Sequence, residues 1–83
     1  MDNLVDYWKL IKKAVSVNST AVDEVTYDEN KKIMLVKFHN GRIYRYEGVP
    51  RAEYEALINA HSVGTYMNQE IVKPDKYTWT EIV

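Results

Sequence analysis

The sequence predicts an α+β fold that begins with an N-terminal amphipathic helix, continues as a three-stranded antiparallel β-meander and then forms two short helices. It leaves room for a fourth strand at the C-terminal edge. Three observations favour this fold. Apolar residues recur at helical spacing before residue 16, three segments rich in β-branched and aromatic residues alternate with turn residues, and helical patterns follow a proline and a serine.

Length and composition limit the classes of function. A chain of 83 residues forms one domain, because it buries only about 60–65% of its unfolded surface. The net charge of -1 does not attract a polyanion, so a nucleic-acid site needs a local patch. The absence of cysteine excludes disulfides and thiolate chemistry and fits a reducing compartment. No apolar run approaches the ~20 residues that span a bilayer, so we expect a cytoplasmic protein without a membrane partner.

Residues 1–15 predict the N-terminal helix. Their apolar side chains are spaced by four, three and four residues, which places them on one face of a helix. These residues are Leu4, Trp8, Ile11 and Val15. The first three are candidate oligomer-interface residues, because an apolar stripe either covers the sheet or pairs with a second copy of the chain. Both alternatives stay open from the sequence.

Three strands are expected over residues 20–27, 33–38 and 42–47, separated by polar turns. A helix then runs from Pro50 to about Ala60, because proline suits the first helical position, where its missing N–H would have no partner. Two further elements follow. A shorter helix begins after Ser62 and ends before Pro74, and residues 78–83 form either a tail or an edge strand.

The loop of the second hairpin decides which face of the sheet Tyr44 and Tyr46 occupy. A two-residue turn would place both rings on the face of Leu35. A three-residue loop ending in a left-handed Gly41 would place them on the face of Val36, because a shift of one residue moves every side chain to the other face. We favour the longer loop because it gathers the largest apolar side chains with both rings, although an Asn-Gly pair alone favours the shorter turn.

Several short motifs occur in a recognisable order. They are Tyr27-Asp28, the spaced Met34, Val36 and Phe38, Asn40-Gly41, Tyr44-Arg45-Tyr46, Val49-Pro50, and the run Ser62-Val63-Gly64-Thr65-Tyr66-Met67-Asn68. This order resembles the KTSC family, named for a short domain at the C-terminus of some lysyl-tRNA synthetases. The resemblance covers residues 16–77 as one domain and leaves residues 1–15 outside it.

The family includes lone small proteins of bacteria and phages, and the resemblance implies RNA binding as one expected function. One segment departs from the family pattern. Where the family has a basic segment after the final isoleucine of the motif run, this chain has only Lys73 and Lys76. The resemblance therefore supports the fold more strongly than the function.

The chain offers little for catalysis. An enzyme without a metal or cofactor needs a nucleophile beside a base, and the only histidines are His39, in a turn, and His61, at the end of a helix. Two distant histidines among scattered carboxylates do not form a metal-ligand pattern. We expect a protein with no catalytic residues, no metal and no cofactor.

The best candidate for a binding site is the start of the helix after Ser62, where free N–H groups favour a phosphate and Gly64 allows close approach. The alternative is that Ser62 only caps its helix and Gly64 allows tight packing. Nearby cations and tyrosine edges could hold a charged, aromatic ligand. The candidate ligand-binding residues are Arg42, Tyr44, Arg45, Tyr46, Arg51, Ser62, Gly64, Tyr66, Asn68 and Lys73.

Three functions follow as hypotheses. The first is a non-catalytic domain that holds a phosphate-bearing nucleotide, as in a phage-type protein that sequesters the cyclic nucleotide signals of host defence. The second is an RNA-binding module that contacts short RNA. The third is a protein-interaction or oligomerisation module. The near-neutral charge favours a small ligand over a long polyanion.

Overall fold

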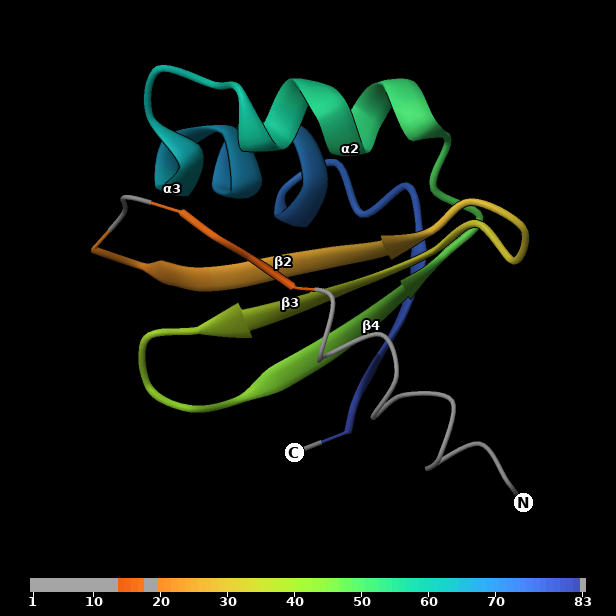
Figure 1. The fold of residues 1–83 in the computed structure, drawn as a ribbon, viewed down its shortest axis with the longest axis horizontal. Helices are drawn as coiled ribbons and strands as arrows, with labels where there is room; N and C mark the ends of the chain where they lie inside the picture. Colours follow the sequence, from red (N-terminus) through yellow and green to blue (C-terminus); the bar gives the residue numbers. More distant parts are fainter. Residues whose placement is uncertain (1–13, 18–19, 83) are drawn as a thin grey trace.

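A five-stranded antiparallel sheet forms one layer of the protein, and helical segments cover one of its faces (Figure 1). This computed structural model describes residues 14–17 and 20–82. The strands are β1 (Val15–Ser16), β2 (Val22–Asp28), β3 (Ile33–Phe38), β4 (Ile43–Glu47) and β5 (Thr78–Glu81). They lie in the order β1-β2-β3-β4-β5, so each strand pairs with the strands before and after it in the chain.

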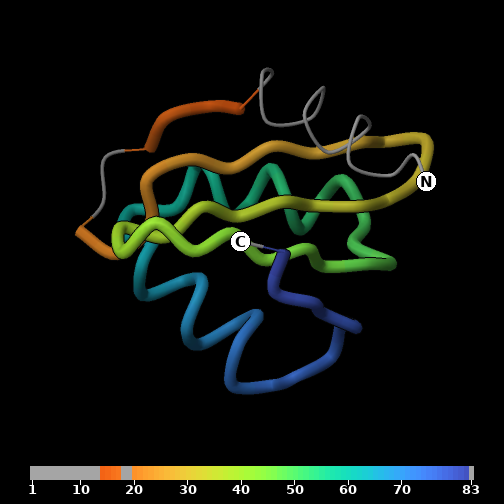
Figure 2. The backbone as a smooth tube through the Cα atoms, turned by 90° about the horizontal axis from the view of Figure 1, so that it is seen from below, coloured from red at the N-terminus to blue at the C-terminus, as the bar shows by residue number. Residues whose placement is uncertain are grey.

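Two α-helices and a π-helical segment separate β4 from β5. They are α2 (Arg51–Ile58), α3 (Val63–Tyr66) and the π-helix η1 (Met67–Val72). Figure 2 shows the chain passing from α3 through η1 and then turning back into β5 beside β4. Among the described residues, no helix has the length and the apolar character needed to cross a membrane.

The main core lies between the sheet and the helices. Its buried residues are Val22, Val25, Met34, Val36, Tyr46, Val49, Leu57, Val63, Met67 and Ile71. Strand residues alternate between the two faces of the sheet, so Leu35 and Ile43 form a second, smaller cluster on the other face. The apolar helix positions after Pro50 thus cover the face that carries Met34 and Val36.

The predicted fold class is wrong in two respects. The sheet has five strands instead of a three-stranded meander, and the last residue of the predicted N-terminal helix lies in a strand. Residues 1–13 of the predicted helix, with Leu4, Trp8 and Ile11, lie outside the described residues. Val15, the last residue of the helical stripe, lies in β1 and pairs with Val25. A β-branched residue fits a strand at least as well as a helix, so pairing with β2 outweighs the helical spacing at this position.

At the other edge of the sheet, β5 occupies the place where the sequence allowed a strand. It pairs along β4, from Thr78 opposite Glu47 to Glu81 opposite Tyr44. Its four residues are all exposed, and only one of its edges is paired within the described sheet.

The longer loop predicted for the second hairpin is confirmed. Val36 pairs with Tyr44, and the Phe38 N–H donates to the Arg42 carbonyl at 2.8 Å. Gly41 closes the loop with a φ of +90°, a conformation that favours glycine because it has no Cβ. Tyr44 and Tyr46 therefore lie on the same face as Val36, toward the helices.

Candidate functional site

A groove of about 700 Å³ lies on the helical side of the sheet, between β4 and β5 on one side and η1 on the other. This volume lies within the usual range of small-ligand sites, roughly 300–1,000 Å³. Its apolar lining consists of Ala21, Phe38, Tyr44, Tyr46, Ile71, Val72 and Trp79. Its polar lining consists of His39, Asn40, Arg42 and Asp75. We call it the aromatic groove.

Three rings form a continuous surface in the groove, centred on Tyr44. Trp79 stacks on Tyr44 with a centroid distance of 5.3 Å and an interplanar angle of 22°. Phe38 meets Tyr44 edge to face at 5.4 Å. Trp79 is 50% exposed, so a large part of its ring surface is open to a ligand. Such a surface accepts a planar, aromatic ligand without rearrangement of the strands.

The ring surface exists because β5 pairs with β4 in one register. That register places Trp79 opposite Tyr46, and cross-strand neighbours on the same face lie within reach of aromatic side chains. Tyr46 is only 4% exposed and belongs to the core, so it forms part of the floor of the groove. Burial, with a smaller contribution from Tyr44, raises the pKa of Tyr46 to about 12. Tyr46 is therefore a neutral phenol at physiological pH.

Arg42 and His39 lie at the end of the groove formed by the loop between β3 and β4. Arg42 pairs with Glu81 at 3.1 Å, and His39 contacts Asp23 at 3.0 Å. All four side chains are at least one-third exposed, so these contacts are weak and a stronger anion can compete for them.

Asp75 follows η1 and lies in the turn that leads to β5. Its carboxylate makes no hydrogen bond or ion pair with the described part of the chain. The φ of Asp75 is +53°, which is a left-handed conformation. Figures 1 and 2 both place this turn and the loop between β3 and β4 toward opposite ends of the molecule. The aromatic groove therefore has a cationic end and a carboxylate end.

A second hollow, of about 440 Å³, surrounds the start of α3. Its lining includes Ser62 and Gly64, and Ala21 lines both this hollow and the aromatic groove. The Ser62 hydroxyl accepts a hydrogen bond from the Thr65 N–H at 3.3 Å and contacts the Thr65 hydroxyl at 2.9 Å. Ser62 thus caps its helix, which is the alternative to phosphate binding that the sequence left open. Its hydroxyl is already hydrogen-bonded to Thr65.

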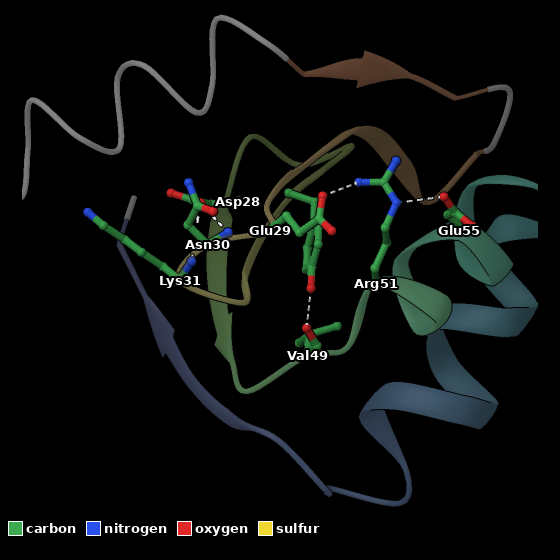
Figure 3. A network of polar contacts seen from close by, with 8 residues as sticks. Asp28, Glu29, Asn30, Lys31, Val49, Arg51 and Glu55 are labelled. Carbon is green, nitrogen blue, oxygen red and sulfur yellow. Dashed lines mark hydrogen bonds and ion pairs between the residues drawn. The ribbon is translucent and has the colours of Figure 1, made fainter.

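The structure does not gather the other predicted cations at either hollow. Arg45 lies on the opposite face of the sheet from Tyr44 and pairs with Glu47 at 2.8 Å. Arg51 begins α2 and lies between Glu29, at 2.9 Å, and Glu55, at 2.8 Å (Figure 3). Both contacts of Arg51 are exposed; they connect a turn to a helix and keep the Arg51 guanidinium away from the groove.

Lys73 and Asn68 are exposed and line neither hollow. The predicted site therefore divides: Arg42, Tyr44 and Tyr46 line the aromatic groove, and Ser62 and Gly64 line the second hollow. The remaining candidates lie elsewhere because spacing in the sequence does not show which face of the sheet or which element carries a side chain.

Tyr66 points to a different polar cluster. Its hydroxyl donates to Glu53 at 2.5 Å, and the Tyr77 hydroxyl donates to the other carboxylate oxygen at 2.7 Å. Lys76 completes the cluster at 2.9 Å from Glu53. The hydrogen bond to Glu53, followed by burial, raises the pKa of Tyr66 to about 12, so the hydroxyl remains a donor. This cluster joins the chain before β5 to α2.

Sequence reasoning missed three of the groove's main contributors. Trp79 carried a signal, because it alternates with threonines in a strand pattern, but its contact with Tyr44 depends on pairing between strands that lie far apart in the chain. Phe38 alternates with Met34 and Val36, which is the pattern of a core residue and not of a binding site. Asp75 carried no signal at all. Within the described residues no group of three or more His, Cys, Asp or Glu side chains is placed to hold a metal ion.

Comparison with known proteins identifies the fold and the family. An uncharacterized protein of Stutzerimonas stutzeri is 37% identical over 70 residues, which cover 84% of this chain and 97% of the relative. A protein of Tsukamurella paurometabola is 36% identical over 58 residues, which cover 70% of this chain and 85% of the relative.

A solved structure has the same fold. The crystal structure of a KTSC domain protein from Yersinia pestis matches with a TM-score of 0.78 at 23% identity, covering 84% of this chain and 96% of that chain. Residues 18–77 match the KTSC domain family itself, which confirms the resemblance seen in the sequence motifs. The chain belongs to the KTSC domain family.

Proposed function

We propose that this protein is a non-catalytic binding domain whose aromatic groove holds a small phosphate-bearing nucleotide, either linear or cyclic. The observation that carries the proposal is the stacked surface of Tyr44 and Trp79 in a groove with a cationic end. A base stacks on such a surface, and stacking is worth about 1–3 kcal/mol per base.

The phosphate belongs at the end of the groove formed by Arg42 and His39. A phosphate carries more charge than a single carboxylate and accepts two parallel hydrogen bonds from a guanidinium, so it can displace Glu81 from Arg42. The hollow around α3 adjoins this end through Ala21 and leaves room for a second phosphate or a second nucleotide.

Short RNA is the second candidate ligand, and the same ring surface favours it. A run of phosphates needs several unpaired cations along its path. In the described residues, Arg51 and Lys76 line neither hollow and are paired with carboxylates, which favours a small nucleotide at Arg42 over an extended strand.

Calorimetric titration of the full chain with linear mononucleotides, cyclic nucleotides and a short RNA tests the proposal. We expect one nucleotide class to bind and Trp79→Ala to weaken that binding by about tenfold or more, because the variant removes the stacking surface. Asn68→Ala is the matched control, since Asn68 is exposed and lies outside the groove.

Two outcomes would overturn the nucleotide proposal. Absence of binding for all mononucleotides and cyclic nucleotides at millimolar concentration removes it. Binding of the RNA alone, with affinity that falls steeply with salt, replaces it by RNA binding.

A further inference from the structure

We infer that the aromatic groove selects guanine nucleotides, with the Asp75 carboxylate reading the Watson–Crick edge of the base; this inference rests on the proposed function. Asp75 lines the groove, and its carboxylate has no partner among the described residues. Such a carboxylate repels an anionic ligand unless the ligand turns hydrogen-bond donors toward it.

The order of groups along β5 orients the ligand. Arg42 contacts Glu81 at the end of β5, Trp79 lies within the strand, and Asp75 lies three residues before its first residue. With a rise of about 3.3 Å per strand residue, the two charged ends are separated by roughly 10 Å or more. With its phosphate near Arg42 and its base on Trp79, a nucleotide turns the outer edge of that base toward Asp75.

Among the common bases, guanine matches a carboxylate best at that edge. Its N1–H and its N2 amino group are adjacent donors that point in the same direction, so each can donate to one carboxylate oxygen. Adenine and cytosine present an amino group beside a ring acceptor, which the carboxylate repels. Uracil presents one N–H between two carbonyls. Two charge-assisted hydrogen bonds therefore form only with guanine.

The neighbouring lysine does not pair with the Asp75 carboxylate. The adjacent Lys76 is engaged by Glu53 at 2.9 Å and so is directed to a different cluster. The left-handed backbone at Asp75, with a φ of +53°, costs free energy for most residues but is tolerated by Asp and Asn. A substitution by asparagine therefore preserves both the shape and the backbone conformation of this turn.

The isosteric substitution Asp75→Asn tests the inference. Affinities of GMP, IMP, AMP and XMP are measured by calorimetry for the wild-type chain and for Asp75→Asn. IMP lacks the N2 amino group, and XMP replaces it with a carbonyl. We expect the wild type to bind GMP at least tenfold more tightly than IMP, AMP or XMP. In Asp75→Asn we expect GMP affinity to fall at least tenfold and XMP affinity to rise, because the amide donates to the new carbonyl.

The outcomes separate the two proposals. If none of the four nucleotides binds the wild type, the guanine selection fails, and the proposed function fails with it when the remaining mononucleotides and the cyclic nucleotides of the first titration do not bind either. If all four bind with equal affinity, or if Asp75→Asn leaves the GMP affinity unchanged while Trp79→Ala abolishes it, the groove binds nucleotides and the selection by Asp75 is wrong. A thermal unfolding curve that is unchanged in Asp75→Asn confirms that any lost affinity is not a loss of folding.

Discussion

The Glu53 side chain is 9% exposed, and its two carboxylate oxygens are shared by three donors, from Tyr66, Tyr77 and Lys76. Burial alone raises the pKa of a carboxyl group, but these hydrogen bonds and the lysine charge outweigh burial and lower the pKa of Glu53. Burial and the bond to Glu53 also raise the pKa of Tyr77. The Glu53 carboxylate in α2 thereby binds residues from two other parts of the chain, Tyr66 in α3 and the adjacent Lys76 and Tyr77 before β5.

Replacing this carboxylate by an amide of the same shape tests its contribution. We expect Glu53→Gln to lower the free energy of unfolding by about 1–3 kcal/mol, because hydrogen bonds to a buried charged group are lost. Urea denaturation at pH 7 measures the loss. Glu55→Gln is the control, since its ion pair with Arg51 is exposed and contributes little to stability. Equal losses in the two variants would contradict the special role of Glu53.

At the scale of elements, the hairpin between β3 and β4 determines the composition of the groove. Its three-residue loop places Tyr44 on the helical face, and the shorter alternative would have placed it on the face of Leu35. This register was predictable, because it gathers the largest apolar side chains on one face and because a glycine stands where the longer loop needs a left-handed residue. The strand β1 was not predictable in the same way, since a β-branched Val15 fits both a helical stripe and a strand.

The conformation of Gly41 provides a test of this loop. A Cβ added at Gly41 would meet nothing within 4 Å, so a substitution there changes only the backbone preference. We expect Gly41→Ala to lower the free energy of unfolding by about 1–2 kcal/mol, because an L-residue is strained at a φ of +90°. Chemical denaturation measures the change, and Asn68→Ala should differ from the wild type by less than about 0.5 kcal/mol. An unchanged midpoint in Gly41→Ala would mean that the loop adopts another turn.

At the scale of the whole molecule, the sequence showed the order of strands and helices from residue 20 onward, because periodicity, turn residues and the family motifs all act locally. The aromatic groove could not be predicted from these local patterns. It requires Trp79 to lie on Tyr44, and only the pairing of β4 with β5 brings them together. The placement of Arg45 and Arg51 away from the groove depends in the same way on the packed structure.

The stability of the whole molecule should depend on pH through Glu53. Its pKa in the folded protein is lower than in the unfolded chain, so the unfolded state binds more protons as the pH falls. The stabilisation is fully present above the unfolded pKa of about 4.3 and is lost as the pH falls through the folded pKa. Urea denaturation from pH 7 to pH 2 should show a smaller decrease for Glu53→Gln than for the wild type. Parallel curves would show that other carboxylates cause the acid sensitivity.

The position of β5 at the far end of the strand order has a consequence for the order of folding. Short turns join β2, β3 and β4, whereas the helical segments separate β4 from β5. Pairing of β5 with β4 must therefore overcome a larger loop-closure entropy than either hairpin does, and we expect it to form after them. A ligand then finds its stacking surface only after β5 has joined the sheet.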